Sequence, residues 1–185
     1  MSALLLIDFQ RAFEDTDVWG SERSDPDAER LALEILDAFR TAGEPVVHVV
    51  HDSLQPASPF RHGSPGFAPL PGFEPGEGES RIVKHENSAF AGTGLDTLLR
   101  RLDVRRLVVA GLTTPHCVST SVRMAANTGF DVTLAGNACA SFAMDCPDGR
   151  RLDAETVQAV HIASLHGEFC RVLPSDEIVA NLSAT

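Results

Sequence analysis

The sequence is poor in basic residues. It has 15 lysines and arginines against 26 aspartates and glutamates, which gives a formal net charge of −11. A protein that follows nucleic acid or an anionic membrane needs a basic surface to bind phosphate groups. The composition therefore argues against both partners, and we expect a small-molecule substrate instead. We interpret the acidic excess as an aid to solubility.

Long apolar runs are also missing. No window approaches the roughly 18 apolar residues of a membrane-spanning helix. The opening residues MSALLLIDFQ lack the basic region with which a secretory signal begins, and we interpret them as the first β-strand. No internal repeat and no second domain is visible, so residues 1–185 are expected to form one domain.

The cysteines do not have the spacing of metal ligands or of a disulfide framework. None of the four belongs to a CxxC pair, and we expect a protein of the reducing cytoplasm. Cys170 alternates with Phe169 in a predicted strand and is expected in the core. Cys139 and Cys146 carry no signal of a role.

Short β-branched or leucine-rich runs alternate with amphipathic helical patterns, which is typical of a parallel sheet with crossover helices. The predicted fold class is α/β, a three-layer α/β/α domain. Its sheet is expected to be six-stranded, mostly parallel and doubly wound, with strand order 3-2-1-4-5-6. The strands are expected at residues 3–9, 45–51, 81–84, 106–110, 131–135 and 168–172.

Capping residues and glycine mark the expected helix boundaries. The first helix is expected to start in SDPDAE, with Ser24 or Asp25 as its cap and Pro26 in its first turn, and to stop at Gly43. A short last helix is expected after Pro174. Apolar residues at helical spacing in these patterns are interpreted as core.

One segment breaks the alternation, because residues 52–79 hold six prolines and five glycines in 28 residues. Loops of this length are uncommon in compact domains unless they are functional or disordered. The segment also contains Phe60, Phe67, Leu70 and Phe73, so we expect it to be ordered. It would form a rim over the functional site or a surface that packs on another subunit, and a plain surface loop is the alternative.

Three residues with reactive side chains lie where predicted strands end. Asp8 ends LLLID, Lys84 ends SRIVK, and Cys117 follows the fourth strand across GLTTPH. The carboxyl ends of parallel strands meet at one sheet edge, where ligands bind in doubly wound folds. A helix that began at Cys117 would lower the pKa of its thiol through unpaired N–H groups and the helix dipole.

Each of the three residues also has an ordinary interpretation. A lone cysteine is most often a small buried apolar residue. Asp8 fits a turn or a helix cap, and Lys84 fits the solvated end of an edge strand. Their joint position at one edge nevertheless favours a nucleophilic cysteine site.

The residues around these three resemble the motifs of a known family. They are LLxIDxQ ending at Gln10, KHxxSAFxGTxL from Lys84 to Leu95, and a VVAGLTTxxCVxxTxRxA-like stretch at residues 108–125. The sequence is thereby similar to the isochorismatase-like cysteine hydrolases, a superfamily that also holds nicotinamidases and N-carbamoyl amide hydrolases. The resemblance spans most of the chain. It departs from the common form at Ser121, where threonine is frequent.

This resemblance implies a catalytic triad of Asp8, Lys84 and Cys117. Asp8 would take the proton of Cys117, Lys84 would hold the thiolate and keep Asp8 ionised, and the thiolate would attack a carbonyl carbon. The resemblance further implies an oxyanion hole formed by the backbone N–H groups of Thr113 and Cys117, and a cis peptide bond between Leu112 and Thr113. Asp8 would then protonate the leaving ammonia and activate the water that cleaves the thioester.

Nicotinamidases of this superfamily bind a metal through an Asp-x-His pair and further histidines after the second strand. This chain has His51, Asp52, Ser53 and later His62 there, without that spacing. His51 and His62 could still meet a metal, but we interpret them as a strand-end and a loop residue. We expect no metal and no cofactor.

The substrate pocket is less sharply defined by the sequence. The candidate pocket residues are Phe13, Ser88, Phe90 and His116. Phe90 would stack on a flat or apolar group and Phe13 would close another wall, with ordinary core packing as the alternative. His116 could also point away from the site. His48 is expected on a sheet face, and His161 is expected as a hydrogen-bonded interior histidine.

The predicted function is hydrolysis of a small-molecule amide or related C–N bond through a covalent thioester. Vinyl ether hydrolysis of the isochorismatase type and metal-dependent nicotinamidase action are alternatives within the hydrolases. A catalytically silent binding or interaction module is the alternative from another class. We also expect a homo-oligomer, a dimer or tetramer, from the resemblance and from the apolar residues of segment 52–79.

Overall fold

The centre of the protein is a six-stranded parallel sheet. The structure is a computed structural model that describes residues 1–183. The strands lie in the order β3-β2-β1-β4-β5-β8, and every neighbouring pair is parallel. They are β1 Ser2–Ile7, β2 Val46–His51, β3 Ser80–Lys84, β4 Arg106–Leu112, β5 Asp131–Ala140 and β8 Arg171–Leu173. The predicted fold class and strand order are confirmed, with β8 as the sixth strand of the sheet.

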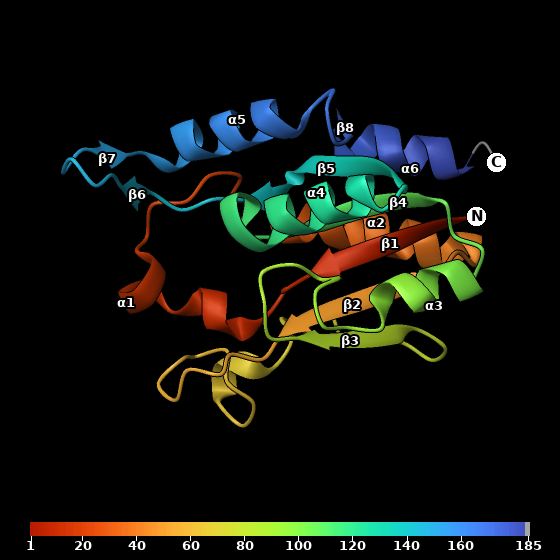
Figure 1. Ribbon diagram of the computed structural model, residues 1–185, viewed down its shortest axis with the longest axis horizontal. Helices are drawn as coiled ribbons and strands as arrows, with labels where there is room; N and C mark the ends of the chain where they lie inside the picture. Colours follow the sequence, from red (N-terminus) through yellow and green to blue (C-terminus); the bar gives the residue numbers. More distant parts are fainter. Residues whose placement is uncertain (184–185) are drawn as a thin grey trace.

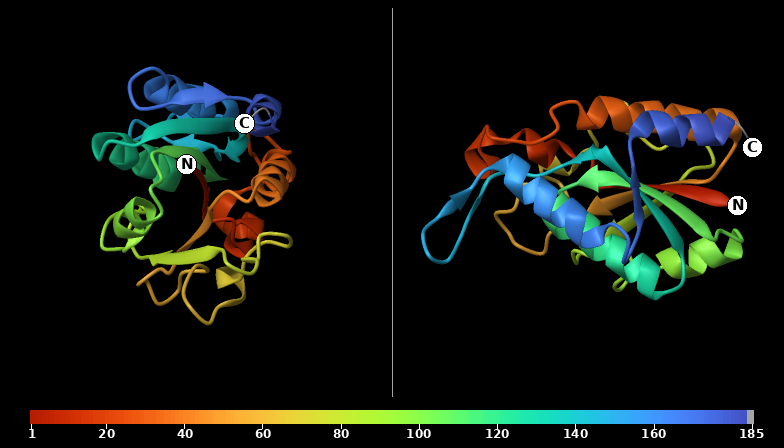
Figure 2. Two further views of the ribbon diagram at one scale, coloured as in Figure 1. Left: turned by 90° about the vertical axis from the view of Figure 1, so that its right-hand side faces the viewer. Right: turned by 90° about the horizontal axis from the view of Figure 1, so that it is seen from above.

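Helices cover both faces of this sheet (Figure 2). One face carries α2 Ala28–Ala42 and α6 Ser175–Ser183, and the other carries α3 Leu95–Arg101, α4 Ser119–Asn127 and α5 Ala154–Leu165. The shorter helical turns are η1 Arg11–Glu14, α1 Thr16–Trp19, η2 Pro65–Phe67 and η3 Thr114–Val118. Within residues 1–183, no helix is both long and apolar enough to cross a membrane.

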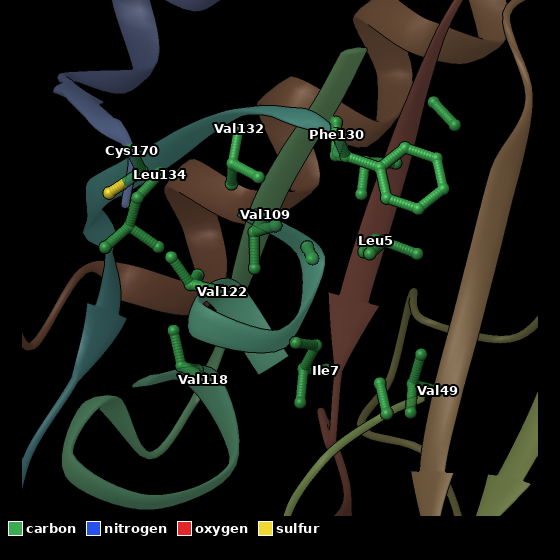
Figure 3. Packing of buried hydrophobic residues seen from close by; sticks show 14 of the residues in the cluster. Leu5, Ile7, Val49, Val109, Val118, Val122, Phe130, Val132, Leu134 and Cys170 are labelled. Carbon is green, nitrogen blue, oxygen red and sulfur yellow. The ribbon is translucent and has the colours of Figure 1, made fainter. Parts of the chain in front are cut away.

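The central strand β1 contributes side chains to the hydrophobic core on both faces of the sheet. Because side chains alternate along a strand, Leu5 and Ile7 pack with the residues under α3, α4 and α5 (Figure 3). Leu4 and Leu6 pack with those under α2 and α6. The sheet is therefore buried on both faces, which explains why its strands read as nearly continuous apolar runs.

The first long helix starts later than predicted. α2 begins at Ala28, and neither Ser24 nor Asp25 caps it. Ser24 instead joins the end of β5, because its hydroxyl accepts the N–H of Ser141 and its own N–H donates to the carbonyl of Ser141. Asp25 has a φ of 45° and lies outside the helix.

The predicted end of α2 is correct, since Gly43 closes the helix in a left-handed conformation.

Segment 52–79 packs several of its apolar side chains against the rest of the chain. Leu70 and Phe73 are buried in the core on the α2 face, and the ring of Phe60 packs edge-on against Phe13. Figure 1 shows much of the segment, with α1, at the end of the sheet toward which β1 points, and its last residues return to the other end, where β3 begins. These apolar side chains are thus used within the chain. The predicted homo-oligomer stays a prediction.

A small antiparallel hairpin was not predicted. β6 Met144–Asp145 pairs with β7 Arg151–Leu152, and the hairpin projects from the same end of the molecule (Figure 1). Two-residue strands are too short to show a periodic pattern in the sequence. The hairpin follows β5, which continues beyond the predicted residue 135 through a register shift and ends at Ala140.

Candidate active site

The carboxyl edge of the sheet brings Asp8, Lys84 and Cys117 together. Asp8 follows β1, with a φ of 55° and its N–H bonded to the carbonyl of Val49. Lys84 is the last residue of β3, and Cys117 lies in η3, directly after β4. β4 can approach β1 closely because residue 111 is glycine: a Cβ there would lie 2.5 Å from the carbonyl oxygen of Ile7.

The ammonium of Lys84 lies between the other two groups. Its Nζ is 2.7 Å from Oδ2 of Asp8 and donates a hydrogen bond of 3.1 Å to Sγ of Cys117. Asp8 and Lys84 are both 0% exposed, whereas Cys117 is partly accessible. Oδ2 of Asp8 is the ion-pair partner of Lys84, and Oδ1 accepts no hydrogen bond of normal geometry from the described residues. A buried ion pair thus lies beside an accessible thiol, and one carboxylate oxygen is available to receive a proton.

Burial sets the proton affinities of this triad. It raises the pKa of Asp8 above the ordinary value, against the pull of Lys84. It also raises the pKa of the Cys117 thiol to about 12, and the charge of Asp8 adds to that rise while Lys84 opposes it. The pKa of Lys84 is raised as well, because Asp8 and Cys117 outweigh its desolvation. The site therefore pairs a protonated thiol with a buried base.

The predicted lowering of the thiol pKa is wrong. The prediction assumed that a helix begins at Cys117, but Cys117 lies inside the π-helical turn η3 and α4 begins at Ser119. Desolvation of the sulfur outweighs any help from neighbouring N–H groups. The thiol needs a base to remove its proton, and Asp8 is in place to do so.

Lys84 is the single lysine of the sequence, so its burial can be tested with an amine-selective reagent. We expect an N-hydroxysuccinimide ester to leave Lys84 unmodified in the native protein and to label it after unfolding in guanidinium chloride. Peptide mass spectrometry reads this directly, because the only other amine is the chain terminus. Rapid labelling of Lys84 in the native state would show that the site is open to solvent.

Two further side chains contact the triad and were missed as site residues. Nδ1 of His51 lies 3.3 Å from Nζ of Lys84, and Oδ1 of Asn87 lies 3.7 Å from Sγ of Cys117. His51 was interpreted as an ordinary strand-end residue. The signal was nevertheless present, because His51 ends β2 as Lys84 ends β3, and the two are partners in the parallel register.

An aromatic cluster stands beside these residues at the same edge. Phe13, which was predicted for the pocket, lies 4.8 Å from Trp19 and 4.9 Å from Phe60 between ring centroids. Phe142 stacks on Trp19 at 5.3 Å, and Phe60 meets the His51 ring at 5.6 Å. The four aromatic residues come from three loops far apart in the sequence, so sequence spacing could not reveal the cluster.

A cavity of about 210 Å³ opens between this cluster and the turn after β4. Trp19 and Phe142 form its apolar wall, and Thr113 and His116 form the side toward η3. Nδ1 of His116 lies 3.1 Å from the hydroxyl of Thr113, which fixes the orientation of the imidazole. His116 therefore faces the cavity, one of the two orientations considered for it.

The peptide bond between Leu112 and Thr113 is cis, which is the geometry that the resemblance implied.

The other two predicted pocket residues serve the fold. The hydroxyl of Ser88 accepts the N–H of Phe90. The Phe90 ring packs on the core under α3 and α4, 6.0 Å from Phe130. Phe130 precedes β5 at the amino end of the sheet, so Phe90 points away from the edge that carries Asp8, Lys84 and Cys117. Ordinary core packing, the alternative considered for Phe90, is what the structure shows.

The remaining histidines do not assemble a metal site. His62 is exposed, while His48 is buried on the sheet with its Nε2 2.8 Å from Glu79. His161 is only half-buried, with its pKa lowered by partial burial, so its predicted interior position is corrected. Residues 1–183 contain no group of three or more histidine, cysteine, aspartate or glutamate side chains that could hold a metal ion.

The other three cysteines are free thiols away from the triad. Cys170 is buried in the core, as predicted, and Cys139 is fully buried in β5. Cys146 lies in the turn between β6 and β7. Each of them lacks the carboxylate and ammonium that surround Cys117.

Comparison with known proteins agrees with this fold. The family model of the isochorismatase domain matches residues 2–162. The chain is 38% identical over 183 residues to the isochorismatase family protein YrdC of Bacillus subtilis, covering 99% of this chain and 97% of that one. A crystal structure of an isochorismatase-family protein from Chromobacterium violaceum has a TM-score of 0.95 and 46% identity, covering 100% of this chain and 94% of that one.

The doubly wound fold and these relatives define a hydrolase. The chain belongs to the isochorismatase family. A relative with a more specific name is a streptothricin hydrolase of Streptomyces noursei, 36% identical over 145 residues. The match covers 77% of this chain and 50% of that longer protein.

Proposed function

We propose that this hydrolase cleaves a small amide or related C–N bond through a thioester on Cys117. The observation that carries the proposal is the position of the Lys84 ammonium, 2.7 Å from the Asp8 carboxylate and 3.1 Å from the Cys117 sulfur. A base, a cation and a nucleophile within hydrogen-bond reach are the parts that covalent acyl transfer needs.

In the first half of the reaction, the proton of Cys117 moves to a free carboxylate oxygen of Asp8 as the sulfur attacks the carbonyl carbon. Lys84 stabilises the negative charge on the sulfur. The tetrahedral intermediate then collapses: the C–N bond breaks, and Asp8 returns its proton to the leaving nitrogen. The products of this half are ammonia or an amine and a thioester on Cys117.

In the second half, water attacks the thioester carbonyl while Asp8 takes one of its protons. The C–S bond breaks, the carboxylic acid leaves, and the proton on Asp8 returns to the Cys117 sulfur. The backbone N–H groups of Thr113 and Cys117 would donate hydrogen bonds to the oxyanion in both halves. The raised pKa of Asp8 suits this shuttle, because a stronger base takes the proton more readily.

The cavity beside the turn suggests the kind of substrate. Its volume of about 210 Å³ and its Trp19 and Phe142 wall fit a small group that is uncharged and largely apolar. The pKa of His116 is lowered by partial burial, so its imidazole is neutral at physiological pH and can donate or accept one hydrogen bond there. A relative named for the hydrolysis of streptothricin supports action on a small molecule.

The triad also argues against a silent binding module. Asp8 and Lys84 form a fully buried ion pair, and Oδ1 of Asp8 lacks a hydrogen bond of normal geometry within residues 1–183. An arrangement of this kind costs folding free energy that a purely structural role does not explain. We propose that the reaction uses no metal, because the described side chains form no cluster suited to one.

We expect the purified protein to release ammonia from members of a panel of small uncharged primary amides, and to do so equally after treatment with EDTA. Coupled glutamate dehydrogenase detection measures the ammonia, and isochorismate and nicotinamide serve as the comparison substrates. Pyruvate release from isochorismate without turnover of any amide would favour vinyl ether cleavage. Loss of activity with EDTA and recovery with Zn²⁺ would favour the nicotinamidase alternative.

A further inference from the structure

The ammonium of Lys84 has more acceptors than it has hydrogens. Besides Oδ2 of Asp8 and Sγ of Cys117, the carbonyl oxygen of Glu86 lies 3.2 Å from Nζ and Nδ1 of His51 lies 3.3 Å from it. An ammonium carries three N–H groups. Two acceptors of the four must therefore share one hydrogen, and the two longest contacts involve an uncharged partner.

We infer that His51 is a positioning residue that accepts the third hydrogen of Lys84 while Cys117 carries the acyl group. This inference rests on the proposed thioester mechanism and adds a residue to it. In the free enzyme the sulfur, the Glu86 carbonyl and Nδ1 of His51 share the two N–H groups that Asp8 leaves, and acylation of the sulfur leaves one of them to His51.

The need for a second acceptor follows from the burial of Lys84. A thioester sulfur is uncharged and accepts hydrogen bonds poorly, so acylation removes one partner of the ammonium. Lys84 is 0% exposed, so a protein acceptor replaces that partner more readily than bulk water does. With His51 as acceptor, the Lys84 ammonium stays in place beside Asp8 during deacylation, when Asp8 must take a proton from water.

The surroundings of His51 suit an acceptor on Nδ1. The side chain of Gln10 holds the main chain of His51 from both sides, accepting its N–H at 2.8 Å and donating to its carbonyl at 3.0 Å. Phe60 packs edge-on against the ring. Burial and the nearby charge of Lys84 lower the pKa of His51. The imidazole is consequently neutral, with its proton on Nε2 and a lone pair on Nδ1.

The test compares two substitutions at position 51. In His51→Asn, the amide oxygen replaces Nδ1 as an acceptor, whereas His51→Leu keeps the volume and removes the acceptor. Because Gln10 binds only the main chain of residue 51, both variants are expected to fold, and thermal melting checks this. The probe is p-nitrophenyl acetate, whose nitrophenolate burst reports acylation and whose steady phase reports deacylation.

We expect His51→Leu to slow the steady phase about tenfold while the burst rate changes less than about twofold, and to accumulate acetyl-Cys117 in mass spectra. His51→Asn should deacylate within about twofold of the wild type. Equal steady rates in all three proteins, or an equal loss in both variants, would overturn the role of His51. A purely structural role predicts that burst and steady phase fall together.

A second measurement needs no substrate. In His51→Leu, three acceptors remain for the three hydrogens of Lys84, so the Cys117 sulfur no longer shares one and the thiolate is stabilised. The rate of alkylation by iodoacetamide at pH 9 should therefore rise at least about threefold in His51→Leu and stay unchanged in His51→Asn. An unchanged rate in His51→Leu contradicts the inference. Absence of any acetyl-enzyme in the wild type would instead contradict the proposed thioester mechanism, and the alkylation rate would still decide the role of His51.

Discussion

Replacing Cys117 by alanine is expected to lower the rate of amide hydrolysis on the order of 10⁶-fold, because the covalent route is lost entirely. The fold should survive the change. Cys117 is only partly buried, and Lys84 keeps Asp8, Glu86 and His51 as partners after the sulfur is removed. Ammonia release from the best amide of the panel measures the effect, with thermal melting as the check on folding.

Cys146→Ala is the matched control for this experiment. It removes a thiol that lies in the hairpin turn between β6 and β7, away from Asp8 and Lys84, and it should leave the rate unchanged. A Cys117→Ala protein that kept more than about 1% of the activity would show that water attacks the substrate directly. Such a result would remove the thioester from the mechanism and leave the family assignment intact.

Replacing Asp8 by asparagine is expected to lower hydrolysis about 10²- to 10⁴-fold, since the base that serves both halves of the reaction disappears. The same change should make Cys117 more reactive toward iodoacetamide at neutral pH. The negative charge of Asp8 is one cause of the raised thiol pKa of about 12. Its removal leaves the thiolate with Lys84 as an unopposed cation, so the thiol ionises at lower pH.

Slower hydrolysis together with faster alkylation is a result that simple damage to the site in Asp8→Asn would not produce. Alkylation rates between pH 6 and 10, below the thiol pKa of about 12, follow the ionised fraction of the thiol and should be higher in Asp8→Asn at each pH. Asp148→Asn, in the turn of the projecting hairpin, is the matched control and should change neither quantity. If alkylation and hydrolysis both fell in Asp8→Asn, Asp8 would promote ionisation of the thiol. That result would contradict the prediction, in which the charge of Asp8 opposes ionisation and its carboxylate carries the proton.

The sheet and the triad were predictable because both follow from local patterns. Apolar runs marked the strands, and the carboxyl ends of parallel strands must share one edge, which placed Asp8, Lys84 and Cys117 near one another. The proton affinities were not predictable in this way. The burial that raises the thiol pKa comes from the whole assembled edge, whereas the sequence offered only the local cue of a helix start.

The errors at individual residues have a common cause. Ser24 is a good helix cap by type, yet it bonds to Ser141, a residue far along the chain. Phe90 follows Lys84 in a family motif, yet its ring packs 6.0 Å from Phe130 at the other end of the sheet. His51 was judged alone, although its register partner is Lys84. Long-range partners decided all three positions, and they cannot be read from neighbours in sequence.

The order of the strands also bears on the protein while the ribosome is making it. Asp8 and Lys84 leave the ribosome before Cys117, but the sulfur meets them only when β4 has docked beside β1 at the centre of the sheet. Until that step, Cys117 is an ordinary thiol with a pKa of about 8.5, and more of it is ionised and open to oxidants than in the folded protein. Folding therefore lowers the reactivity of the Cys117 thiol toward oxidants at the same step that places it beside Lys84.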